Sequence, residues 1–246
     1  MRGWPWQTNE QPENTRLTNM MQSEHERRAY LRAMGIDLWI PRDQVDVEPE
    51  RAEPGMQAAT DELGWDELRA AVADCTLCPL HESRTQTVFG VGSPAADWMI
   101  IGEAPGAEED RRGEPFVGRA GKLLDEMLLA IGEKRGSVFI ANILKCRPPN
   151  NRDPSPDEAA SCRPYLERQI ELVQPKIILA VGRIAAQQLL QSDAPVGRLR
   201  GKVHQLGEIP LVVTYHPAYL LRSPSQKRKS WDDLCLAAQV MAAAAA

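Results

Sequence analysis

Four of the chain's five cysteines fall in a pattern typical of metal ligation. Cys75 and Cys78 are separated by two residues, which lets both thiolates face one ion, and Cys146 and Cys162 follow at longer intervals. Four thiolates from separate segments suit either tetrahedral zinc or an iron–sulfur cluster. The alternative, in which Cys146 and Cys162 are only buried hydrophobic residues, stays open, although the spacing favours joint ligation. Cys235 lies between leucines of an expected helix and is predicted to belong to the core.

A second group of residues could hold a planar ligand. Residues 102–106 form a loop that carries Glu103, and the glycine-rich residues 113–121 carry Phe116, one of only three phenylalanines. An aromatic ring in a loop before a helix can stack on a nucleic-acid base. The first loop alone is typical of an ordinary turn. The two loops together favour a site where Glu103 presents a carboxylate beside the ring.

Further polar residues follow apolar segments. Asn142 is either a satisfied core amide or a reader of the donor and acceptor edge of a base, because burying an amide is costly without partners. His216 directly follows an apolar segment, and a lone histidine there is commonly a packing or capping residue. The loop after it, with Leu221 and Arg222, is expected to present an exposed apolar tip and a cation, as proteins that wedge into a duplex do. Arg147 adds a basic group in the turn after Asn142.

These residues lie at the ends of alternating strands and helices. Compact apolar segments predict strands over residues 98–101, 138–144, 177–181 and 210–214. Amphipathic patterns and capping residues predict helices over residues 65–74, 122–131, 155–173, 183–190 and 227–242. This alternation indicates a parallel sheet covered on both faces, with its ligand site at the carboxyl ends of the strands.

The composition of the 246-residue chain excludes several classes of protein. With 43% hydrophobic and 26% charged residues it is neither collagen-like nor fully disordered. No apolar run approaches the roughly 18 residues that cross a bilayer, and no secretory signal is recognised, so we expect a cytoplasmic protein with reduced thiols. A net charge of -5 argues against a uniformly basic surface, but it allows a local basic groove.

The first 60 residues differ in composition from the rest. They are polar and rich in proline, which predicts a largely disordered extension followed by a folded domain over residues 61–246. One island at about residues 24–42 has apolar side chains at helical spacing and then in alternation. It is either an amphipathic tail that packs on its own domain or a segment that binds a partner.

Residues 65–240 resemble the family 4 uracil-DNA glycosylases, the iron–sulfur type. The motifs that carry the resemblance occur in family order: Cys75-x-x-Cys78, Gly102-Glu103-Ala104-Pro105-Gly106, Gly113-x-Pro115-Phe116-Val117-Gly118-x-Ala120-Gly121, Asn142-x-x-Lys145-Cys146-Arg147-Pro148-Pro149, Cys162 and His216-Pro217. The resemblance implies a three-layer α/β/α fold, for which we expect a mostly parallel four-stranded sheet. It also implies removal of uracil from DNA, and a 4Fe–4S cluster held by Cys75, Cys78, Cys146 and Cys162.

The resemblance also implies a role for each residue of the site. Asn142 would read the amide edge of a flipped uracil, His216 would stabilise the oxyanion on the leaving base, and Glu103 would orient water or stabilise the sugar cation. The uracil site would be completed by Gly102, Ala104 and Phe116, and DNA would be contacted by Arg147, Leu221 and Arg222. The better-known glycosylase branch has an aspartate where Ala104 stands, which leaves the water-activating role of Glu103 open.

Residues 27–42 resemble the short peptide by which the psi subunit of bacterial DNA polymerase III binds the clamp loader. This second resemblance implies clamp-loader subunits as partners, so the alternative function is a replisome accessory subunit on a glycosylase fold, with or without activity. A third hypothesis is a zinc-stabilised nucleic-acid-binding module without activity. The joint presence of Glu103, Phe116, Asn142 and His216 argues against that hypothesis.

Overall fold

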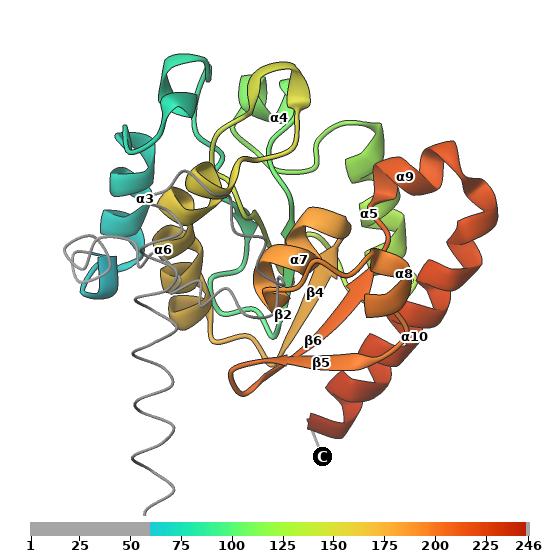
Figure 1. The fold of residues 1–246 in the computed structure, drawn as a ribbon. Helices are drawn as coiled ribbons and strands as arrows, with labels where there is room; N and C mark the ends of the chain where they lie inside the picture. Colours follow the sequence, from blue (N-terminus) through green and yellow to red (C-terminus); the bar gives the residue numbers. More distant parts are fainter. Residues whose placement is uncertain (1–59, 245–246) are drawn as a thin grey trace, which may run out of the picture. The chain divides into compact units, whose positions relative to one another are not determined.

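The computed structural model describes residues 60–244, which belong to the second of the chain's two units, residues 52–246 (Figure 1). The expected island at residues 24–42 and the clamp-loader-binding segment at residues 27–42 lie outside the described residues. Within the described part, no helix has the length and apolar character needed to cross a membrane.

A six-stranded sheet in the order β1-β3-β2-β4-β6-β5 forms the centre of the described part. Its four inner strands are parallel: β3 (Phe139–Asn142), β2 (Trp98–Gly102), β4 (Ile177–Val181) and β6 (Ile209–Thr214). They correspond to the four strands predicted from apolar segments. The antiparallel edge strands are β1 (Val91–Gly92) and β5 (Val203–Leu206).

We expected a four-stranded sheet, and this was wrong because the sheet also contains these two edge strands. β1 has only two residues, one of them a glycine, and β5 alternates exposed and half-buried side chains. Neither has the continuous apolar run that marks a strand buried on both faces, so neither was recognisable by that criterion. The α/β fold class itself is confirmed.

Helices cover both faces of the sheet in three layers (Figure 1). One face packs against α3 (Trp65–Ala73), α6 (Pro156–Val173) and α7 (Arg183–Leu190). The other packs against α5 (Arg119–Leu129), α9 (Pro217–Arg222) and α10 (Lys227–Ala244). Neighbouring residues of β2 point into opposite layers: Ile101 joins the first core cluster and Ile100 the second, as strand geometry requires.

The longer helices follow their sequence signals closely. α6 begins with a capping box, in which the Ser155 hydroxyl accepts a hydrogen bond from the Glu158 amide (3.2 Å) and the Glu158 carboxylate accepts one from the Ser155 amide (2.9 Å). Several short helices were not predicted, because one or two turns are too short to show a helical period: α4 (Ala107–Arg112), α8 (Val196–Leu199) and α9. Three single 3-10 turns complete the set: η2 (Pro79–Glu82), η3 (Pro149–Asn151) and η4 (Pro224–Gln226).

Candidate active site

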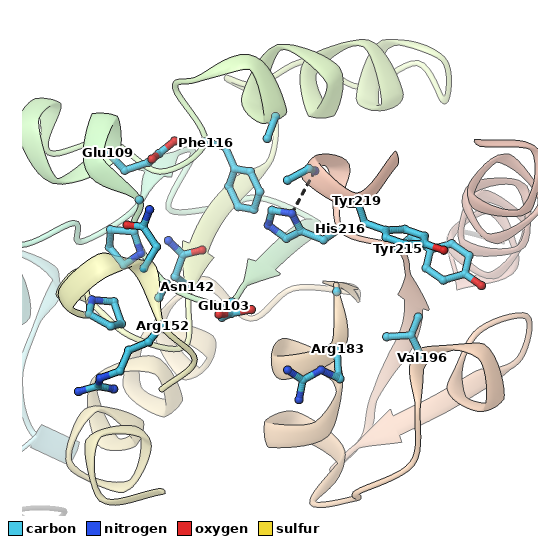
Figure 2. Close-up of a pocket in the computed structure, with 18 of the residues that line it drawn as sticks. Glu103, Glu109, Phe116, Asn142, Arg152, Arg183, Val196, Tyr215, His216 and Tyr219 are labelled. Atoms are coloured by element: carbon cyan, nitrogen blue, oxygen red, sulfur yellow. Dashed lines mark hydrogen bonds between the residues drawn. The ribbon is translucent and has the colours of Figure 1, made fainter. Parts of the chain in front are cut away.

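A cleft of about 790 Å³ opens where the four parallel strands end (Figure 2). Each strand contributes a lining side chain from its carboxyl end or the loop that follows: Glu103 after β2, Asn142 on β3, Arg183 after β4 and His216 after β6. This is the ligand-binding edge of an open parallel sheet, where successive loops diverge and leave a crevice. This is the edge at which the apolar segments of the sequence predict the ligand site.

Phe116 and His216 form one wall of the cleft. Their rings are stacked, with centroids 5.6 Å apart and an angle of 29° between planes. Phe116 has a φ of 53°, in the left-handed region that is unfavourable for a bulky residue, so its conformation needs support from its surroundings. The Arg135 guanidinium provides it by donating hydrogen bonds to the backbone carbonyls of Phe116 (3.2 Å) and Pro115.

Two neighbouring carboxylates of α4 accept hydrogen bonds from two different segments of the chain. The Glu109 carboxylate accepts hydrogen bonds from the amides of Val117 (3.0 Å) and Gly118 (3.4 Å), directly after Phe116. The buried Asp110 carboxylate accepts hydrogen bonds from the Thr85 amide, at 2.9 and 3.1 Å to its two oxygens. α4 therefore connects the loop that carries the Phe116 ring to the segment that follows the first cysteine pair.

Asn142 lies opposite this wall as a buried amide. Its side chain is 2% exposed, and its Oδ1 has no hydrogen-bond partner among the described residues. A buried acceptor left in that state costs about 1–3 kcal/mol. A Cβ on Gly102 would lie 2.5 Å from this oxygen and 2.6 Å from Cζ of Phe116, so glycine is required there by close approach. Asn142 thus presents an unsatisfied acceptor in the cleft that Phe116 also lines.

His216 is oriented by the helix it caps. Its Nδ1 accepts a hydrogen bond from the Ala218 amide at 3.1 Å, at the start of α9 (Figure 2). In the neutral ring the proton is therefore on Nε2, which becomes the donor. Burial, and after it the nearby Arg222, lower the pKa of His216 to about 4, while Glu109 opposes them. His216 is a neutral hydrogen-bond donor at pH 7.

Glu103 supplies a carboxylate to the cleft. Burial raises its pKa above the ordinary value, the charge of Asp153 raises it further, and Arg183 opposes the shift. Its backbone carbonyl accepts a hydrogen bond from the Leu144 amide (3.1 Å), which ties the loops after β2 and β3 together. Ala104, the next residue, also lines the cleft.

Three arginines line the cleft as well: Arg152, Arg183 and Arg222. Arg152 forms a two-point ion pair with Glu158 (2.8 and 2.6 Å), and Arg183 pairs with Asp153 at 2.5 Å. Of these three, only Arg222 was predicted to contact DNA. Arg183 could have been found from its place directly after an apolar strand, where the parallel-sheet rule puts ligand contacts.

The remaining predicted DNA contacts lie elsewhere. Arg147 does not line the cleft, and its Nε donates to Oδ1 of Asn151 at 2.7 Å. The segment after His216 was expected to be an exposed loop, but it is the helix α9, in which Leu220 is 1% exposed and packs in the core. Leu221 is half-buried. Leu220 and Leu221 are neighbours on a helix, so their side chains point in different directions.

The four predicted cysteine ligands line one small cavity, called here the cysteine cavity: Cys75, Cys78, Cys146 and Cys162. Nη1 of Arg84 lies 3.1 Å from Sγ of Cys146, and the Lys145 amide lies 3.2 Å from Sγ of Cys162, so both donate to sulfur. Burial raises the pKa of Cys162 to about 12. Cys235 does not line this cavity and is half-buried on α10.

Comparisons with known proteins agree with this architecture. Residues 89–236 match the model of the uracil DNA glycosylase superfamily. The chain is 43% identical over 176 residues to a type-4 uracil-DNA glycosylase of Archaeoglobus fulgidus, covering 68% of this chain and 88% of the relative. It is 43% identical over 182 residues to one of Pyrobaculum aerophilum (71% and 93%) and 44% identical over 158 residues to one of Thermotoga maritima (63% and 82%). Because the matched residues contain all six strands and every residue that lines the cleft, this chain belongs to the uracil-DNA glycosylase superfamily.

Proposed function

We propose that this chain is a uracil-DNA glycosylase that takes uracil out of the DNA stack and hydrolyses its N-glycosidic bond. The observation that carries the proposal is the buried Asn142 amide, whose Oδ1 lacks a partner beside the ring of Phe116. A flipped base supplies both a flat face for the ring and polar edge groups for the amide. The names of the type-4 relatives support the same substrate.

Phe116 and Asn142 together would select the base. Phe116 stacks on the ring, while the Asn142 amide pairs with the N3–H donor and the O4 acceptor of uracil. Cytosine presents an acceptor and a donor at the same two positions, so an amide held in one orientation discriminates against it. A Cβ at position 102 would clash with both side chains, so the glycine leaves the space that this arrangement needs.

His216 and Glu103 would lower the barrier to cleavage of the glycosidic bond. As the bond between C1′ and N1 breaks, its electron pair moves onto uracil and the sugar becomes cationic. The neutral His216 donates from Nε2 to the developing oxyanion at O2. The Glu103 carboxylate stabilises the cationic sugar and accepts the proton of the water that adds to C1′. Uracil leaves as an anion and is protonated afterwards, and an abasic site remains.

The cysteine cavity suits a thiolate-held 4Fe–4S cluster, which we propose as the resident cofactor. All four cysteines line it, and donors from Arg84 and the Lys145 amide point at two of the sulfurs, which stabilises negative charge there. Within residues 60–244, no three His, Cys, Asp or Glu side chains are gathered as a metal-binding group. When bound, the cluster supplies structural cross-linking of three segments, because base excision moves no electrons.

The decisive experiment is cleavage of a uracil-containing oligonucleotide, followed by alkali to break abasic sites. The full-length protein should cut the uracil strand and leave the matched thymine strand intact. Asn142→Ala should lower the single-turnover rate by roughly two orders of magnitude. Gln205→Ala, which removes an exposed amide on β5, should keep the parental rate. Absence of cleavage by the iron-loaded protein would refute the proposed activity.

The segment at residues 27–42 supports a separate proposal, that the enzyme associates with clamp-loader subunits at the bacterial nucleoid, in the cytoplasm. Its support is the resemblance stated above and the grouping of large apolar side chains around Trp39. Trp39→Ala in the full-length chain should weaken binding to the purified clamp loader in calorimetry. Trp4→Ala should not, and equal affinity of the two variants would overturn this proposal.

A further inference from the structure

Lys145 is a buried cation to which the proposed reaction assigns no role. Its side chain is 1% exposed, and Nζ donates to the backbone carbonyl of Asn142 at 2.9 Å and to Oε1 of Gln169 at 2.6 Å. Both acceptors are neutral. Lysine is almost never fully buried without a charged partner, because desolvating an ammonium costs several kcal/mol. Because burying the Lys145 ammonium is so costly, its presence needs an explanation other than core packing.

The position of Lys145 between two regions explains why a cation can stay there. Its backbone amide donates to Sγ of Cys162, the next residue is Cys146, and Lys145 itself lines the cysteine cavity. Thiolates that hold a cluster carry negative charge, which compensates the ammonium through space. On its other side, Nζ reaches the end of β3, where Asn142 leaves the sheet.

Gln169, on α6, accepts a hydrogen bond from the Lys145 ammonium and holds it in place. Its own side chain is 0% exposed, and its Nε2 donates to the Phe89 carbonyl at 2.9 Å. The Lys145 carbonyl in turn accepts a hydrogen bond from the Val88 amide at 2.7 Å. The segment before β1 therefore fixes both Gln169 and the main chain of Lys145. The ammonium links this fixed pair to one atom, the carbonyl oxygen of Asn142. A displacement of that oxygen rotates the peptide from which the base-reading amide projects.

We propose that Lys145 is a positioning residue for uracil excision, which holds the main chain of Asn142 so that its amide meets the flipped base in the reactive orientation. The inference rests on the proposed function of the cleft. It adds a second layer to the site, formed by Lys145 and Gln169, which touches no substrate. A misplacement of about 1 Å at a reacting group can cost up to about a hundredfold in rate, so a contact of this kind can be visible in kinetics.

The test compares Lys145→Met, which keeps the length of the side chain and removes the donor, with Lys176→Met. Lys176 forms a half-exposed ion pair with Asp97, and it precedes β4 at the end of the sheet opposite the cleft. In single-turnover assays, normalised to iron-loaded protein, Lys145→Met should lower the maximal rate about tenfold. Its dissociation constant for abasic DNA should stay within about twofold of the parent, since phosphate contacts are untouched. Lys176→Met should change neither quantity.

A second measurement separates positioning from general destabilisation. Inhibition by free uracil reports the fit of the base in the pocket without any contribution from the DNA backbone. Lys145→Met should raise the uracil inhibition constant several-fold, and the shift should persist at 15 °C, well below the unfolding transition. A loss confined to temperatures near that transition, with parental uracil inhibition at 15 °C, would show a structural role only and overturn the proposal.

Gln169→Met provides the deciding variant if Lys145→Met does not yield folded protein. It removes the far acceptor of the ammonium and leaves Lys145 in place, so the same split between rate and abasic-DNA affinity should appear at about threefold. Parental rate and uracil inhibition in Gln169→Met would then overturn the inference. If the parental protein itself fails to excise uracil, the proposed function falls instead, so the two failures are distinguishable.

Discussion

The cleft and the cysteine cavity share one short segment of chain and are built in opposite ways. The cleft encloses about 790 Å³ and is lined by charged, aromatic and amide side chains, whereas the cysteine cavity is lined by sulfur and mainly apolar side chains. Residues 142–146 border both. A site that must receive and release a nucleotide needs open volume, but a site that holds a permanent group needs only its ligands and the exclusion of water. The comparison shows that one short loop borders both an open, polar cleft and a closed, mainly apolar cavity.

Burial acts on titratable groups in both regions, but with different consequences. In the cleft it lowers the pKa of His216 to about 4 and so keeps the ring neutral, which is the state the proposed reaction uses. In the cysteine cavity it raises the pKa of Cys162 to about 12, which opposes the thiolate that ligation requires. Binding of the proposed cluster would have to displace that proton, and its free energy would then contribute to folding.

The largest effect is expected when a cysteine of the cysteine cavity is removed. Cys146→Ala should reduce bound iron from about four atoms per chain to less than one, and it should lower the thermal midpoint by about 10 °C or more, because three segments lose their common anchor. Iron analysis and scanning calorimetry measure both. Cys235→Ala, which alters a half-buried cysteine outside the cavity, should keep the parental iron content. A colourless parental protein with one zinc would refute the cluster.

The second-largest effect is expected from a substitution within the cleft. His216→Ala should lower single-turnover uracil excision by roughly a hundredfold, because it removes a neutral donor to the leaving base. Iron content should be unchanged, and abasic-DNA affinity should change by less than about threefold. Quenched-flow assays and anisotropy titrations give these values. A parental rate in this variant would show that the oxyanion is stabilised elsewhere.

A third prediction uses the lowered pKa of His216. An unfolded histidine titrates near its ordinary value of about 6.5, whereas the folded ring resists protonation down to about pH 4. Between these values only the unfolded state takes up the proton, so this group makes stability fall as pH falls from about 6.5 to about 4. His216→Gln should flatten that part of the stability profile, measured by urea denaturation. Nitrogen NMR should find the parental ring neutral at pH 6, with its proton on Nε2.

The smallest expected effect concerns the rim of the cleft. Arg222→Ala should weaken binding to abasic DNA by about three- to tenfold and reduce the slope of affinity against salt by about one, since it removes one phosphate contact. Arg111→Ala changes an exposed arginine of α4 that does not line the cleft, so it should leave affinity and slope near parental values. Equal salt slopes for all three proteins would remove Arg222 from the DNA contacts.

The sequence predicted the parallel centre of the sheet and the edge where the cleft opens, because both depend on local apolar runs. Asn142 was recognisable because an amide within such a run is costly. Lys145 was not, since a lysine beside a basic turn resembles a surface residue until the fold buries it. Arg152 and Arg183 were missed for a related reason: arginine is common on surfaces, and only the fold brings these two to one cleft. The proposed ligation of one cluster by all four cysteines was favoured by their spacing, but it rested mainly on the family resemblance.

The short helix α4 has a consequence for motion. Its successive carboxylates, Glu109 and Asp110, hold amides on two different loops, so a single opening of this helix would release Val117 and Thr85 together. The helix has only six residues and is bounded by Gly106 and Gly113, which makes it a weak cooperative unit. Opening of the loop that carries Phe116 and of the segment after the first cysteine pair would then share one rate, set by α4 rather than by either segment.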